Sequence, residues 1–156
     1  MEQYYKKIES ITYVILILAI IAGLWSAIEQ IIVYFQTLRH YMGTSKIVAS
    51  VNFLQNIIRS ITYFGVIIIA NLIILSKQKS KLTVLLFLTA SLILLVIQAT
   101  GGLGSIVQNI FLFFSDILNA KQVLRTSGHF GVSLLMLILT IYQYTELVKT
   151  FKEETA

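Results

Sequence analysis

The chain has 156 residues, of which 57% are hydrophobic and only 12% are charged, and its net charge is +5. A soluble domain needs about 25% charged residues to cover its surface, so this composition excludes an ordinary soluble protein and indicates a chain embedded in lipid. The absence of cysteine excludes disulfides, thiolate metal sites and cysteine nucleophiles. Because the basic residues are scattered between apolar runs, membrane topology explains the positive charge better than nucleic-acid binding does.

Four apolar runs are long enough to cross a membrane as helices. They predict spanning helices at about residues 10–35, 57–76, 82–100 and 126–148. A helix of about 20 residues, rising about 1.5 Å per residue, crosses a hydrocarbon core of about 30 Å. The first run is too long for the apolar region of a signal peptide and is interpreted as a retained anchor. We therefore predict an all-α integral membrane protein whose residues 1–156 form a single polytopic domain.

The third run is too long for one spanning helix. Residues 82–115 contain no charge, and a single helix of that length would measure about 51 Å, more than any bilayer core. Because each glycine weakens a helix by about 1 kcal/mol, we predict a helix break at Gly101, Gly102 and Gly104. The segment 103–118 that follows is amphipathic. It is interpreted as an interfacial helix, with re-entry into the membrane or packing on the other helices as alternatives.

The distribution of lysine and arginine predicts the orientation of the chain. With four crossings both termini lie on the same side as the segment 77–81, and these parts together hold seven of the twelve Lys and Arg residues. By the positive-inside rule the termini are expected to be cytoplasmic, in a bacterial or archaeal plasma membrane. The segment 146–156 is interpreted as the frayed or cytoplasmic end of the last helix. Tyrosines near helix ends, Tyr4 and Tyr63 among them, are interpreted as interfacial anchors.

Two blocks of sequence recur and suggest an internal duplication. The block GLWSAIEQI at 23–31 aligns with GLGSIVQNI at 102–110, and RSITYFGV at 59–66 aligns with RTSGHFGV at 125–132. They predict two tandem repeats, 8–76 and 82–149, each with two spanning helices and an amphipathic segment. Two crossings return the chain to its starting side, so the repeats are parallel and related by an axis along the membrane normal. Gly65 and Gly131, which correspond, are predicted helix-packing positions. Chance matching between apolar helices is the alternative.

A cluster of polar residues is predicted near the membrane face opposite the termini. Its members are Glu29, Gln30, Arg59, Gln108, Asn109, Arg125 and His129. An ionisable group costs about 2.5–3.5 kcal/mol at the centre of a spanning helix, so Glu29 is expected to pair with Arg59 or Arg125. The cluster is interpreted either as a polar vestibule that faces a substrate or as a helix-end ion pair with arginines reaching the interface. The two histidines are isolated, so no metal site is expected.

The sequence contains no catalytic constellation, phosphate-binding loop or cofactor motif, so the chain is expected not to be an enzyme and to bind no cofactor. One remaining function is a non-enzymatic small subunit or accessory that binds other membrane helices or self-assembles. The alternative is a small homo-oligomeric channel or transporter with an outward-facing polar vestibule. The lack of charge near the bilayer midplane counts against transport. The expected partners are the lipid bilayer and other membrane subunits or a second copy.

Overall fold

In the computed structural model the chain forms four long helices: α1 (Glu2–His40), α2 (Thr44–Leu75), α3 (Lys81–Phe114) and α4 (Ala120–Thr155). The structure describes residues 2–40, 44–77, 80–114 and 120–155, with side chains described over 2–39, 46–77, 80–108 and 127–153. All four helices are long and apolar enough to span a membrane. The prediction of an all-helical chain with four helices able to span a membrane is therefore confirmed, although each helix extends beyond its predicted span at one or both ends.

Local hydrogen bonds end α2 and begin α3 at the connection between these two helices. Lys77 has a φ of 52°, a left-handed conformation that commonly ends a helix. Its N–H donates to the carbonyl oxygen of Ile74 at 3.0 Å. Ser80 then begins α3 as its N-cap, because its Oγ accepts a hydrogen bond from the backbone N–H of Thr83 at 3.4 Å. The absence of proline leaves the four helices without a proline kink.

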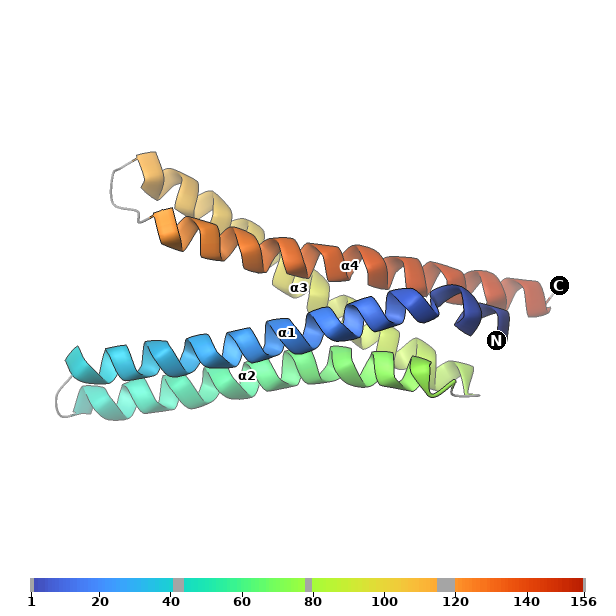
Figure 1. The fold of residues 1–156 in the computed structure, drawn as a ribbon, viewed down its shortest axis with the longest axis horizontal. Helices are drawn as coiled ribbons and strands as arrows, with labels where there is room; N and C mark the ends of the chain where they lie inside the picture. Colours follow the sequence, from blue (N-terminus) through green and yellow to red (C-terminus); the bar gives the residue numbers. More distant parts are fainter. Residues whose placement is uncertain (1, 41–43, 78–79, 115–119, 156) are drawn as a thin grey trace.

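The helices form two antiparallel hairpins. α1 packs most extensively on α2, and α3 on α4, while α1 also contacts α4 and α2 also contacts α3. Figure 1 shows the two hairpins close together at the end that carries both termini and separated at the opposite end, where each hairpin turns. The core shared by all four helices consequently lies in the half of the molecule near the termini.

Two groups of buried apolar side chains make up that core. The inner cluster, nearer the termini, contains Tyr4, Tyr5, Ile8, Ile74, Val84, Leu88 and Leu147. The central cluster contains Ile15, Ala19, Tyr63, Phe64, Ile67, Leu95 and Met136. Tyr4 is 1% exposed and Tyr63 is 8% exposed, which corrects their interpretation as interfacial anchors. They are buried because four helices converge on them at this end.

The predicted helix break in the third apolar run is wrong. α3 continues without interruption through Gly101, Gly102 and Gly104 to Phe114, so residues 103–114 extend this helix and do not form a separate interfacial one. Residues 115–118 of the predicted segment lie outside the described residues. The tertiary contact explains the difference, because Gly102 lies directly against the Phe130 ring of α4. Packing on a neighbouring helix outweighs a propensity cost of about 1 kcal/mol per glycine.

The close contacts within the hairpins occur at Gly23 and Gly102 rather than at the predicted positions Gly65 and Gly131. A Cβ on Gly23 would lie 3.3 Å from the Cβ of Phe64, whereas a Cβ on Gly65 or Gly131 would meet no described atom within 4 Å. Each of these two glycines directly follows the phenylalanine that makes the contact. One residue turns about 100° around a helix, so the glycine faces away from the partner helix.

The contact at Gly102 gives a matched test of the continuous α3. A Cβ on Gly102 would lie 2.8 Å from Phe130 Cδ2, and overpacking of this kind costs about 1–3 kcal/mol. Gly102→Ala also gains up to about 1 kcal/mol of helix propensity, so it should lower the free energy of unfolding by up to about 2 kcal/mol. Gly104→Ala, whose Cβ would meet no atom within 4 Å, should raise it by up to about 1 kcal/mol through helix propensity. Reversible unfolding by SDS in mixed micelles measures both, and equal effects would contradict the packing described.

Candidate functional site

Glu29 of α1 is held between two side chains. Its Oε2 lies 3.0 Å from Nε2 of His129 on α4, and its Oε1 accepts a hydrogen bond from Trp25 Nε1 at 2.8 Å. The Glu29 side chain is 13% exposed and that of His129 is 34% exposed. The carboxylate thus faces protein, as expected of an acid near hydrocarbon, and the pair joins the first hairpin to the second.

Arg59, one of the two predicted partners of Glu29, is exposed on α2. Its neighbour Ser60 donates a hydrogen bond to Ser26 Oγ of α1 at 3.0 Å, so Ser60 is the residue that faces α1. A step of one residue turns the side chain by about 100°, which directs Arg59 away from this contact. In the structure it is His129, another member of the predicted cluster, that lies against Glu29.

The remaining members of the predicted polar cluster do not gather around Glu29 in one group. Gln30 is half-buried on α1, and Gln108 is exposed on α3. The side chains of Asn109 and Arg125 lie outside the described residues, so pairing of Glu29 with Arg125 stays a prediction. What the structure brings together from the cluster is the Glu29–His129 pair.

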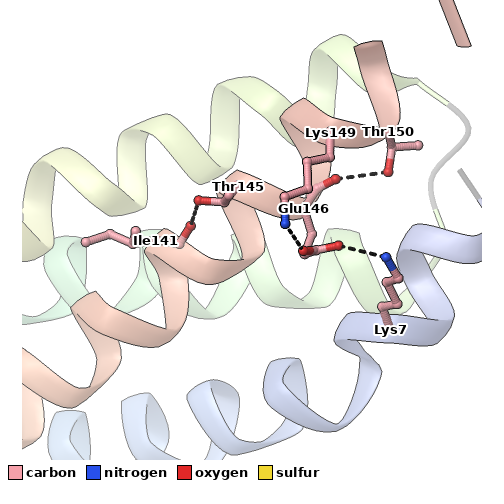
Figure 2. A network of polar contacts seen from close by, with 6 residues as sticks. All are labelled: Lys7, Ile141, Thr145, Glu146, Lys149 and Thr150. Carbon is pink, nitrogen blue, oxygen red and sulfur yellow. Dashed lines mark hydrogen bonds and ion pairs between the residues drawn. The ribbon is translucent and has the colours of Figure 1, made fainter. Parts of the chain in front are cut away.

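A second polar contact joins the hairpins at the end that carries the termini. Glu146 of α4 is 6% exposed. Lys7 Nζ of α1 donates to its Oε2 at 3.1 Å, and Lys149 Nζ donates to its Oε1 at 2.8 Å. Figure 2 shows the carboxylate held between the two lysines. Residues 146–155 are helical and not frayed, because α4 continues to Thr155 and Glu146 contacts α1; their location in the cytoplasm stays a prediction.

A third polar contact lies inside the bundle. Gln143 Nε2 of α4 donates hydrogen bonds to Thr12 Oγ1 of α1 at 2.9 Å and to Asn71 Oδ1 of α2 at 3.1 Å. Thr12 and Asn71 also donate to backbone carbonyls of their own helices, those of Ile8 and Ile67, each at 2.8 Å. Gln143, Thr12 and Asn71 are at most 1% exposed. One buried amide thereby links α4 to both helices of the first hairpin.

Comparison of this chain with protein-family models, curated proteins and solved structures finds no match. We therefore infer the roles of its residues from the geometry of the polar contacts. Within the described part of the chain, no three His, Cys, Asp or Glu side chains gather as they would around a metal ion. The polar groups instead bond to one another between helices. Such contacts stabilise the association of helices in a membrane.

The buried amides were missed by sequence reasoning, which concentrated on charged residues. Asn71 and Gln143 each stand inside an otherwise apolar run. An amide in a membrane helix normally hydrogen-bonds across to a neighbouring helix, so this pattern could have identified both. The pairing of Gln143 with Thr12 could not have been identified in this way, because threonine occurs along all four helices.

A double-mutant cycle tests the contact between Glu29 and His129. Glu29→Gln and His129→Gln should show a coupling energy of about 0.5–1 kcal/mol in the free energy of unfolding, because the pair is only partly buried. The matched control is Glu29→Gln combined with Arg59→Gln, whose effects should add within about 0.5 kcal/mol. Unfolding in mixed micelles supplies the measurement. A larger coupling to Arg59 than to His129 would contradict the structure.

Proposed function

We propose that the chain is a non-enzymatic multi-pass membrane protein that acts as a small subunit or accessory, binding other membrane helices or a second copy of itself. Helix length supports this proposal. The 34 residues of α3 make a helix about 51 Å long, about 20 Å more than the hydrocarbon core. The connection around Lys77 and Lys81 belongs in the headgroup region, because lysine in hydrocarbon is costly. The excess length therefore emerges at the other end, where the hairpins turn.

The parts of the hairpins beyond the hydrocarbon core form two outer arms. About 20 residues of α2 and of α3, counted from the connection between them, fill the hydrocarbon core, and α1 and α4 leave it at the same level. Outer arm 1 then comprises residues 32–40 and 44–55, and outer arm 2 comprises residues 101–114 and 120–130. Outer arm 1 exposes large apolar side chains on both of its helices: Ile32 50%, Val33 42%, Phe35 58%, Ile47 66%, Val48 59%, Val51 46% and Leu54 57%. In outer arm 2, Leu103 is 50% and Val107 is 51% exposed.

The exposed side chains of outer arm 1 form a stripe suited to a partner. Ile47, Val51 and Leu54 recur at a spacing of three and four residues, which places them on one face of α2. In the hydrocarbon core such a face would simply meet lipid. Beyond it, contiguous apolar patches of more than a few hundred Å² mark surfaces that contact proteins or membranes. The exposure of these apolar side chains is the observation that carries the proposal, and their position beyond the hydrocarbon core is part of the proposal.

We also infer that the two hairpins are tandem repeats, 8–76 and 82–149, in parallel orientation. The Gly23–Phe64 contact in the first hairpin and the Gly102–Phe130 contact in the second join residues that the sequence alignment places at corresponding positions. The helix contacts agree with this, since α1 packs on α2 and α4, and its counterpart α3 packs on α4 and α2. A duplicated hairpin accounts for the presence of two similar arms on one side of the membrane.

The proposed location is a bacterial or archaeal plasma membrane with both termini in the cytoplasm. The positive-inside rule supports it, because the short connection and the two terminal segments carry most of the lysines. The outer arms would then extend outside the cytoplasm, where they could meet the extramembrane helices of a neighbouring subunit.

Single cysteines test the assembly surface, because the chain has none of its own. Phe35→Cys lies on outer arm 1 at a side chain that is 58% exposed. Leu86→Cys is the matched control, at a position that is 60% exposed within the predicted hydrocarbon span. A thiol-specific photocrosslinker in native membranes should give a larger product with Phe35→Cys and none with Leu86→Cys. A membrane-impermeant maleimide should label Phe35→Cys from outside the cell.

The size of the product identifies the partner: twice the mass of the chain indicates self-assembly, and another mass indicates a different subunit. If Phe35→Cys gives no product and the purified chain is monomeric in mild detergent, the proposed function is wrong. Labelling of Phe35→Cys from the cytoplasmic side would overturn the proposed orientation without affecting the proposed assembly.

A small homo-oligomeric channel or transporter is the second candidate. The observation that favours it is a series of polar contacts between the hairpins, from Lys7–Glu146 through Thr12–Gln143 to Glu29–His129. The last of these contains the acid of the expected vestibule. A chain that conducts cations should show flux in proteoliposomes that Glu29→Gln reduces and Arg59→Gln leaves unchanged. Absence of flux from folded, reconstituted protein would eliminate this candidate.

A further inference from the structure

Each of the four helices carries a buried polar residue between the inner and the central cluster. In α1, Thr12 lies between Ile8 of the inner cluster and Ile15 of the central cluster. The same alternation places Asn71 between Ile74 and Ile67, Ser91 between Leu88 and Leu95, and Thr140 and Gln143 between Leu147 and Met136. Thr12, Asn71, Ser91, Thr140 and Gln143 therefore lie at one level of the bundle, and we call them the polar layer.

The helix contacts support this placement of Ser91. Gly102 of α3 lies against Phe130 of α4, and the two helices are antiparallel. Ser91 is eleven residues before Gly102, and residue 141 is eleven residues after Phe130. Ser91 is thereby level with the turn of α4 that carries Thr140 and Gln143. All four helices contribute to the layer at the same height.

Three polar atoms of this layer have no hydrogen-bond partner within the described structure. They are Ser91 Oγ, Thr140 Oγ1 and Gln143 Oε1, and their residues are at most 1% exposed. A buried polar atom without a hydrogen bond is costly and rare, and it commonly marks a bound water or ion. The two hydroxyls can donate and accept, and the amide oxygen can accept. Together they offer a hydrogen-bonding set for a small guest.

We propose that the polar layer is an internal hydration site, in which water bridges Ser91, Thr140 and Gln143. A buried water makes about three hydrogen bonds to polar groups that otherwise lack partners, which these three atoms supply. A cation suits the layer poorly, because all five side chains are neutral and an uncompensated charge in a low-dielectric interior is costly. The nearest acid along α4, Glu146, is already held by Lys7 and Lys149.

The hydrated layer would complete the connection between the two hairpins. Gln143 Nε2 is directed to Thr12 and Asn71 of the first hairpin, so its Oε1, on the other side of the amide, remains for the water. The water in turn bonds to hydroxyls of the second hairpin. This inference concerns the bundle interior and is independent of what the outer arms bind.

The sign of a stability change tests the proposal. Thr140→Val keeps the shape of the side chain and removes its hydroxyl. If that hydroxyl binds water, the substitution loses a hydrogen bond and the thermal midpoint in detergent should fall. If the layer is dry, the substitution removes an unpaired buried group and the midpoint should rise. Thr89→Val is the control, because the Thr89 hydroxyl donates to the Leu85 carbonyl of its own helix at 2.8 Å. Its midpoint gives the effect of removing a threonine hydroxyl that bonds to protein and not to water.

Magnetisation transfer from water supplies a direct measurement. In protein labelled with ¹⁵N at glutamine, the side-chain amide of Gln143, assigned by its loss in Gln143→Leu, should receive magnetisation from water. Thr140→Val and Ser91→Ala should each weaken that transfer. No transfer to Gln143, together with a raised midpoint for Thr140→Val, would overturn the proposal. A midpoint that Na⁺, K⁺ or Li⁺ raises in the natural chain and not in Thr140→Val would also overturn it, in favour of a cation.

Discussion

Polar side chains inside a lipid-embedded bundle must find their partners within the protein, and the pairing of the two hairpins depends on this constraint. Between helices in a bilayer the hydrophobic effect offers little preference, because lipid tails are as apolar as leucine. α1 and α4 are instead joined by specific polar contacts, with Gln143 bonded to Thr12 in the core and Glu146 bonded to Lys7 at the termini. Displacing α4 along α1 would leave these groups unpaired, so the contacts fix the register.

Within each hairpin the recurring feature is a steric fit between glycine and phenylalanine. Gly23 lies against Phe64, and Gly102 against Phe130, so a glycine on one helix admits an aromatic ring from the next. Close approach of this kind is how membrane helices gain packing energy. It also explains why α3 remains one helix through its glycines. Ring-on-glycine contacts thus recur inside both hairpins, while apolar clusters, hydrogen bonds and ion pairs join one hairpin to the other.

The packing of the four helices differs between the two ends of the molecule. Near the termini, four helices enclose two apolar clusters with a polar layer between them. Toward the hairpin turns the two pairs of helices separate (Figure 1), and large side chains such as Phe35 are exposed. In the proposed function, the closed end of the bundle is the anchor and the open end presents the apolar arms. That division underlies the proposed role as a membrane subunit.

The amino-acid sequence by itself determined the all-helical class and the number of helices able to span a membrane, because apolar runs and their charged borders depend only on the cost of placing each residue in lipid. It also singled out Glu29 and His129 as members of one polar cluster. It did not give the partner of Glu29, the continuity of α3 or the packing positions of the glycines. Those depend on which face of each helix meets its neighbour, and a rotation of about 100° per residue separates Phe130 from Gly131. Only the tertiary structure decided these points, since helix rotation and register are set by contacts between residues far apart in the chain, such as Gln143 with Thr12.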